Sequence, residues 1–99
     1  MTKLEKDLEA RCVKHVEDLG GKCLKVKAEG QRGFPDRLII LDRFMGLVEF
    51  KRPDGKGKVS RHQERFIDFL TAKRVPCLIT DSYEEFAEWL HVYSKIKTP

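Results

Sequence analysis

Apolar residues recur at helical spacing in three stretches of the chain. In residues 3–19 they stand at every third or fourth position, and the run stops at Gly20-Gly21, which predicts a first helix. A second helix is predicted from Ser60 to about Lys73, because Ser60 can act as its N-cap and Gln63, three residues later, can complete a capping box.

Shorter stretches rich in aliphatic and β-branched residues alternate with turn residues, as is typical of β-strands. They comprise residues 23–26, 38–41, 47–51 and 75–80. A turn over residues 42–46 makes the second and third strands a predicted hairpin. A third helix is predicted to follow the last strand, capped by Asp81 or Ser82.

The predicted order of elements is therefore α-β-β-β-α-β-α. Because a helix crosses over before the last strand, we expect a mixed sheet flanked by helices, which is an α/β arrangement. A chain of 99 residues fits a single domain spanning 1–99.

Composition indicates a globular protein, with 40% hydrophobic and 36% charged residues. We find no apolar signal core at the N-terminus and no run near the roughly 20 apolar residues that a membrane span needs. The cysteines, Cys12, Cys23 and Cys77, form no CxxC pattern, so we expect buried thiols rather than disulfides or zinc ligands. These features predict a cytoplasmic protein, with no membrane partner and no organic cofactor.

The formal net charge of +4 favours a polyanionic partner. Basic residues crowd the stretch from Lys51 to Arg61, whereas the C-terminal part is acidic. The residues predicted to contact DNA phosphates are Arg32, Arg52, Lys56, Lys58 and Arg61. The alternative is a solvated charged loop without a ligand.

Three residues suggest chemistry at one end of the predicted hairpin. Glu49 and Lys51 are two positions apart on a strand, so their side chains point to one face, while Val48 and Phe50 point to the other. Asp36 stands where the preceding strand begins, close to that end of the hairpin. Two carboxylates and a lysine suit phosphodiester hydrolysis with Mg²⁺ or Mn²⁺, although a surface hairpin with a Glu/Lys pair would show the same tripeptide.

Carboxylates also occur on the apolar side of the first helix. Glu5 falls inside the apolar arc and Glu9 lies at its edge. Either can face the predicted site or pair with a nearby cation, and we favour Glu9 for the functional role. Gln63 lies on the apolar side of its own helix, where it can face the site or only complete the capping box.

The helical Glu9, Gly33-Phe34-Pro35-Asp36, Glu49-Phe50-Lys51 and the helical Gln63 follow one another over most of the chain. In this order they resemble the PD-(D/E)XK nuclease superfamily, specifically the stand-alone VRR-NUC type of phages and bacteria. The resemblance implies a restriction-endonuclease-like core and a divalent-metal-dependent DNA endonuclease in a bacterium or a phage-infected host cell.

The resemblance also implies roles for these residues. Asp36 and Glu49 would be the principal metal ligands, with the Phe50 backbone carbonyl as a further ligand and Glu9 as a direct or water-mediated one. Lys51 would activate water and stabilise charge on the phosphate, and Glu9 and Gln63 would complete the catalytic set.

Small stand-alone members of this type resemble Holliday-junction resolvases, which implies a homodimer acting on branched DNA. Three alternatives remain: a nicking or restriction-like nuclease without junction specificity, a non-catalytic nucleic-acid-binding module, and a basic scaffold subunit of a larger complex.

Overall fold

A computed structural model of the protein describes residues 2–96, and their side chains up to residue 94. The predicted order α-β-β-β-α-β-α is confirmed. The elements are α1 (Lys3–Asp18), β1 (Lys22–Lys25), β2 (Arg37–Leu41), β3 (Phe44–Phe50), α2 (Arg61–Ala72), β4 (Cys77–Thr80) and α3 (Tyr83–Ile96).

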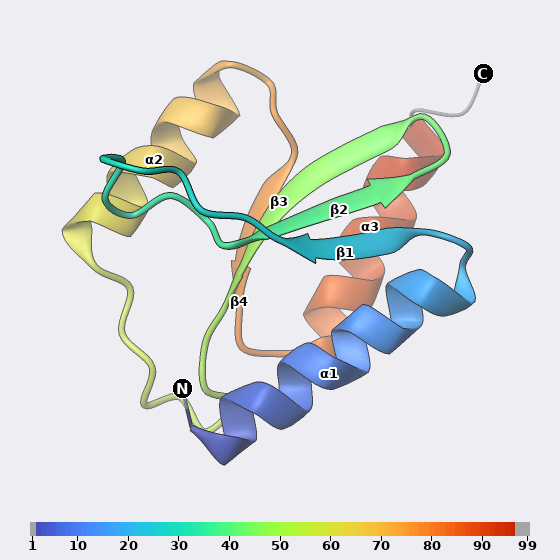
Figure 1. The fold of residues 1–99 in the computed structure, drawn as a ribbon, viewed down its shortest axis with the longest axis horizontal. Coiled ribbons are helices and arrows are strands. Elements are labelled where there is room, and N and C mark those ends of the chain that lie inside the picture. The colour runs from blue at the N-terminus through green and yellow to red at the C-terminus, as the bar shows by residue number, and fades with distance from the viewer. Residues whose placement is uncertain (1, 97–99) are drawn as a thin grey trace.

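The four strands form one mixed sheet in the order β1-β2-β3-β4. β1 pairs with β2 and β2 with β3 in antiparallel fashion, whereas β3 and β4 are parallel, as the helical crossover through α2 requires. α1 and α3 lie together against one face of the sheet, and α2 lies beside β4 (Figure 1). The expected α/β arrangement is therefore confirmed.

The hydrophobic core lies between the sheet and the pair α1 and α3. α1 contributes Leu8, Cys12 and Val16 from the apolar stripe that predicted it, and the strands and α3 contribute the remainder. Gly46 lies where a Cβ atom would come 2.8 Å from the Trp89 ring. The indole thus occupies the space that any larger residue at position 46 would need.

The predicted boundaries of the hairpin are wrong at one point. β3 begins at Phe44 rather than Leu47, because Leu41 pairs with Phe44 and only Asp42 and Arg43 form the turn. Arg43, the second residue of this turn, adopts the left-handed conformation with φ 57°. The glycine at position 46 suggested a longer turn, but it belongs to the strand.

The last predicted strand is also shorter than expected. It begins at Cys77, because the Val75 amide donates to the Leu70 carbonyl at the end of α2 and Arg74 adopts φ 62°. The chain therefore turns through residues 74–76 before it enters the sheet.

Helix capping follows the local sequence. The Gln63 amide donates to Ser60 Oγ at 3.1 Å and the Ser60 amide donates to Gln63 Oε1 at 3.0 Å, which completes the predicted capping box. Of the two candidate caps for α3, Ser82 serves, since its Oγ accepts from the Glu85 amide at 3.1 Å.

All three cysteines are free thiols. Cys12 and Cys23 are buried as expected, and burial raises the pKa of Cys12 to about 12 and that of Cys23 to about 11, so both stay protonated at neutral pH. Cys77 is only half-buried.

Among the described residues, none of the helices has both the length and the apolar character that a bilayer crossing requires.

Candidate active site

The hairpin brings Asp36, Glu49 and Lys51 to one end of β3. Arg37 pairs with Val48 across the antiparallel ladder, so the preceding residue, Asp36, stands opposite Glu49. The Asp36 amide donates a hydrogen bond to the Glu49 carboxylate. Local sequence explains the common direction of Glu49 and Lys51, because the alternate residues of the strand point into the core.

Lys51 lies immediately after the last residue of β3 and is held at its backbone. Its amide donates to the Thr80 carbonyl at 2.8 Å, which continues the pairing of β3 with β4. The side chains of Val48 and Phe50 are 0% and 3% exposed on the opposite, core-facing side. Tertiary packing thus fixes the backbone that presents the lysine.

The electrostatic environment of Glu49 is unfavourable for a negative charge. Burial, followed by repulsion from Asp36, raises the pKa of Glu49 to about 7, against the opposing effects of Lys51 and the hydrogen bond from the Asp36 amide. Two carboxyl groups therefore lie close enough to repel each other, and a cation between them would relieve that repulsion. A perturbed acid in such a cluster is typical of functional sites.

The raised pKa of Glu49 predicts how its replacement affects stability. A carboxyl whose pKa is higher in the folded than in the unfolded chain stabilises the fold at low pH, and that contribution is lost as the pH rises through 7. Glu49→Gln should therefore be more stable than the wild type at pH 8 in EDTA, with a smaller gain at pH 5. Urea unfolding at both values measures this, and an equal difference at both values would contradict the raised pKa.

Asp36 and Glu49 suit a hard divalent cation through their carboxylate oxygens. Within residues 2–96, no group of three or more His, Cys, Asp or Glu side chains is arranged to hold a metal ion. A cation here would accordingly depend on two carboxylates, a backbone carbonyl such as that of Phe50, and water, which is the sparse protein coordination that Mg²⁺ tolerates.

The two acids of α1 have different surroundings. Glu9 is 3% exposed and pairs with Arg37, with Oε1 3.3 Å from Nη2. Glu5 is the last and smallest of the named causes that act on the pKa of Glu49. Glu9 thus lies beside a cation, while the charge of Glu5 acts weakly on Glu49, so the choice between the two acids stays a prediction.

Gln63 is engaged by the capping box at the first turn of α2. The loop that leads to Asp36 packs against this same turn: a Cβ atom on Gly33 would lie 2.4 Å from the His62 carbonyl carbon and 2.7 Å from the Gln63 nitrogen. Gly33 also has φ 88°. Both the close contact and this backbone conformation therefore require glycine at position 33. This contact ties the start of α2 to the loop before Asp36.

The predicted phosphate-contacting residues are not equivalent. Lys56, Lys58, Arg61 and Arg32 are exposed, whereas Arg52 is partly buried and pairs with Asp54 at 2.6 Å. The Lys56 amide also donates to Asp54 at 3.0 Å, and this hydrogen bond, followed by Arg52, holds the pKa of Asp54 below its usual value. Asp54 therefore offsets one of the charges that the sequence suggested for DNA.

The loop after Lys51 folds back onto the site. A Cβ atom on Gly57 would lie 3.0 Å from Lys51 Cβ and 2.9 Å from the Arg52 nitrogen. Sequence spacing identified this loop as basic and glycine-containing, but gave no sign of its contact with Lys51.

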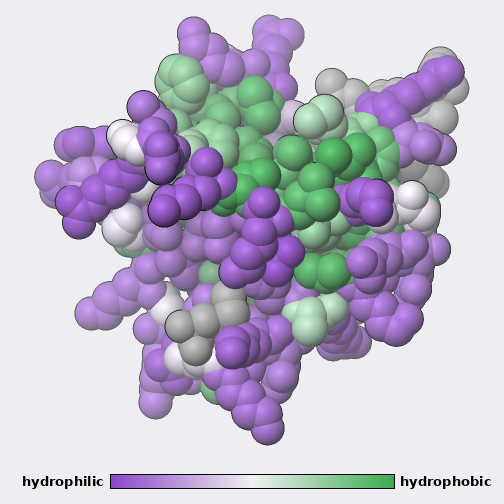
Figure 2. All heavy atoms as spheres, in the orientation of Figure 1, coloured by the Kyte–Doolittle hydropathy of each residue, from purple (hydrophilic) through white to green (hydrophobic). Residues whose placement is uncertain are grey.

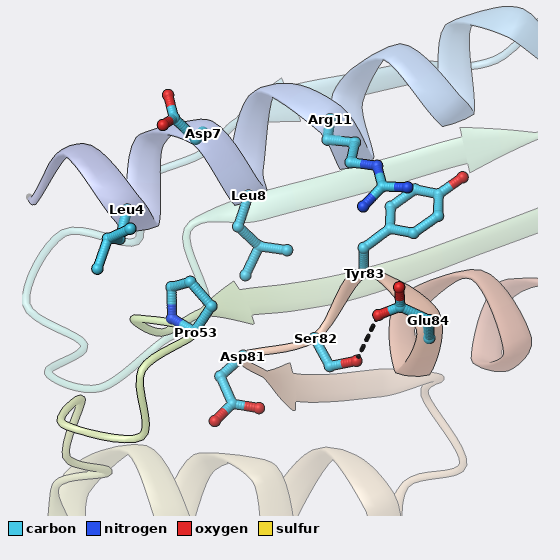
Figure 3. A pocket seen from close by; sticks show the side chains of 9 residues that line it. All are labelled: Leu4, Asp7, Leu8, Arg11, Pro53, Asp81, Ser82, Tyr83 and Glu84. Atoms are coloured by element: carbon cyan, nitrogen blue, oxygen red, sulfur yellow. Dashed lines mark hydrogen bonds between the residues drawn. The ribbon is translucent and has the colours of Figure 1, made fainter.

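A hollow of about 480 Å³ lies elsewhere, between the first half of α1 and the start of α3 (Figure 3). Arg11 stacks there on the Tyr83 ring, with its guanidinium carbon 3.7 Å from the centroid, and Ser82 donates to Glu84. Carboxylates of Asp7, Asp81 and Glu84 outnumber this single cation in the lining. The hollow is thus unsuited to a polyanion.

Sequence reasoning missed Arg37, which follows Asp36 and neutralises Glu9. Its position on β2, where its side chain shares a face with Ile39, is the signal that places it toward α1. His15 hydrogen-bonds Tyr83 through Nδ1 at 2.9 Å.

No protein-family model matches the chain, and the curated proteins contain no significant match. Among solved structures, a chain described as "VRR_NUC domain" matches with a TM-score of 0.82 and 27% sequence identity, over 93% of this chain and 99% of that one. Similarity over nearly the whole of both chains confirms the resemblance that the motifs indicated: this protein has the fold of a VRR-NUC domain, a nuclease-type fold with a restriction-endonuclease-like core.

Proposed function

We propose that residues 1–99 form one divalent-metal-dependent DNA endonuclease domain, with its active site at Asp36, Glu49 and Lys51. The juxtaposition of Asp36 and Glu49 across the hairpin, with Lys51 on the same face, carries the proposal. The printed description of the matched solved structure, a VRR_NUC domain, supports it.

Asp36 and Glu49 would hold the metal, with the Phe50 backbone carbonyl as a further ligand. When bound, Mg²⁺ or Mn²⁺ would polarise the scissile phosphate and lower the pKa of coordinated water. Lys51 would donate hydrogen bonds to a phosphate oxygen and orient the attacking water, stabilising the charge that develops on the phosphate.

For the acid contributed by α1, we propose Glu5, since its charge acts on Glu49 and Glu9 is paired with Arg37. Glu5 would accept a hydrogen bond from water at the site. Gln63 would support the site from the start of α2, while keeping its capping interaction with Ser60.

We further propose that the substrate is branched DNA, such as a Holliday junction, and that the enzyme acts as a cytoplasmic homodimer. Two symmetry-related sites can cut two strands of a branched substrate in a defined relation. Exposed Lys56, Lys58, Arg61 and Arg32 offer phosphate contacts that position a duplex without selecting its sequence.

Incubation with four-way-junction, splayed-arm and linear duplex DNA, each with Mg²⁺, Mn²⁺ or EDTA, tests the proposal. We expect junction cleavage with either metal and none in EDTA. Equal cleavage of all three substrates would identify a nicking or restriction-like enzyme instead. Binding without cleavage under every metal condition would identify a non-catalytic module and reject the endonuclease proposal.

The loop from Arg52 to Arg61 should become ordered on DNA. It contains exposed lysines on either side of the half-buried Gly57 and lies against Lys51, so a bound phosphate backbone would cover it. Limited trypsin digestion in EDTA should cut the loop at Lys56 and Lys58 in the free protein and at least about tenfold more slowly with a four-way junction bound. Unchanged cutting would contradict a DNA contact at this loop.

A further inference from the structure

α2 carries cations and an aromatic ring along one side of its surface. Residues four positions apart on a helix are neighbours on its surface, and this spacing joins Arg61, Arg65, Phe69 and, at the C-cap, Lys73. All four side chains are exposed, and that of Phe69 is 54% exposed. We call these four residues the α2 stripe. In Figure 2, green hydrophobic surface over α2 is interrupted by purple hydrophilic side chains.

An open hollow of about 290 Å³ lies beside the stripe. Its lining consists of Gln31, Arg65, Phe66 and Phe69. Phe69 packs edge-on against Phe66, with 6.3 Å between the ring centroids. Aromatic rings and guanidinium groups are the surfaces on which unpaired nucleobases stack. The hollow therefore suits a planar, aromatic ligand of the size of one base.

The cations around Phe69 are available to a ligand. In the described part of the chain, no salt bridge engages a cation of the α2 stripe; Lys73 instead lies over the Phe69 ring, with Nζ 5.7 Å from its centroid. The acids of α2, Glu64 and Asp68, each precede a stripe residue by one position and are turned about 100° away from it. The stripe thus combines an apolar ring with unneutralised positive charge, whereas the core of a protein–protein interface is depleted of charged residues.

A chain of contacts joins the hollow to the proposed active site. Phe66 packs edge-on against Phe34, with 5.4 Å between the ring centroids, and Phe34 precedes Asp36 by two residues. The same loop lies against the start of α2, where Gly33 meets the His62 carbonyl. A DNA strand that lies along α2 would therefore reach Asp36 over a short distance.

From these observations we propose that α2 binds a single-stranded segment of DNA, with one unpaired base stacked in the hollow against Phe69 and Phe66. The cations of the α2 stripe would contact the phosphates on either side of that base. Aromatic rings set among cations bind single strands with little sequence preference, because every base has a face that can stack. Gln31 would donate or accept a hydrogen bond at the edge of the base. The inference rests on the proposed action on branched DNA and adds a subsite for a nucleotide that is unpaired at the branch.

Phe69→Leu tests the stacking. Its readout is the fluorescence anisotropy of a labelled oligothymidylate of about 12 nucleotides, a length within the site sizes of single-strand-binding domains, in EDTA. Leucine keeps an apolar side chain but removes the ring, so we expect the dissociation constant to rise at least about fivefold with an unchanged circular-dichroism spectrum. Phe69→Trp should bind at least as tightly as the wild type.

Tyr93→Leu is the matched control. Tyr93 is 40% exposed on α3, which packs on the opposite face of the sheet from α2. Its replacement also removes an exposed aromatic ring, and the affinity for oligothymidylate should stay within about twofold of the wild type.

Two further measurements separate stacking from charge. In the Phe69→Trp variant, the bound oligothymidylate should quench the indole emission because thymine stacks on the ring, whereas the wild type, whose Trp89 is buried, should change little. Arg65→Ala should weaken binding and reduce the slope of the logarithm of the binding constant against the logarithm of the salt concentration by about 0.7, as expected for one lost phosphate contact with a single strand.

Unchanged affinity in Phe69→Leu, unquenched emission in Phe69→Trp, or a wild type that binds no oligothymidylate at concentrations up to about 100 µM would overturn the subsite. None of these results would touch the chemistry, because metal-dependent cleavage is measured separately on four-way-junction and duplex DNA. Conversely, a wild type that binds oligothymidylate through Phe69 but cleaves no DNA with either metal would reject the nuclease and leave the subsite standing.

Discussion

Lys51→Ala and Asp36→Asn should each reduce DNA cleavage by at least about 1000-fold in saturating Mg²⁺. Lys51 is the cation placed on the same face as the two carboxylates, and Asp36 is one of the two carboxylates proposed to hold the metal. Removing either takes away charge that is needed in the transition state. The binding of a four-way junction in EDTA should change less than about threefold, because most of the proposed phosphate contacts, those of Lys56, Lys58, Arg61 and Arg32, lie outside the trio.

Initial cleavage rates and an electrophoretic binding assay measure the two effects separately. Lys58→Ala is the matched lysine control: it lies exposed in the same loop region and should weaken junction binding modestly while leaving the maximal rate at saturating DNA within about threefold of the wild type. If Lys51→Ala and Asp36→Asn both retained cleavage, the site would lie elsewhere on the molecule.

Glu9→Ala should lower the free energy of unfolding by about 3–5 kcal/mol, because it leaves the Arg37 guanidinium buried without its partner. Arg37 is itself largely covered, with 15% of its side chain exposed beside a carboxylate that is 4% exposed. For a chain of this length, the loss corresponds to a fall in Tm of at least about 12 °C. Thermal and urea unfolding of the metal-free protein measure it.

Glu5→Gln is the matched control on the same helix. Its carboxylate is only half-buried and no salt bridge joins it to a residue within the described part of the chain, so Tm should change by less than about 3 °C. Its effect should fall on cleavage instead, since its charge acts on Glu49.

A Glu9→Ala variant with wild-type stability and no activity would reverse this assignment and return the functional role to Glu9. The double variant Glu9→Met with Arg37→Met supplies a further check, because replacing both members of a buried ion pair with apolar groups is close to neutral. It should recover most of the stability that Glu9→Ala loses.

Local sequence determined much of this protein. The spacing of apolar residues predicted α1, and the Ser60–Gln63 capping box predicted the start of α2. Both signals depend on only a few consecutive positions. The alternation of Val48, Glu49, Phe50 and Lys51 is equally local, and it assigned two of the three central site residues to one face. Asp36 stands opposite Glu49 only because the hairpin turn is two residues long, since turn length sets the register of the ladder.

Only the tertiary structure decided the rest, because those features depend on residues far apart in the chain. Gly46 lies within β3 rather than in a turn because it pairs with Ile39 across the ladder, and its missing side chain leaves the space that the Trp89 ring fills. Glu5 and Glu9 are one helical turn apart and alike in sequence, but only Glu9 meets Arg37. β1 and β2 carry helices on one face only, because α1 and α3 both pack on that side, and this arrangement depends on the whole fold rather than on any single strand.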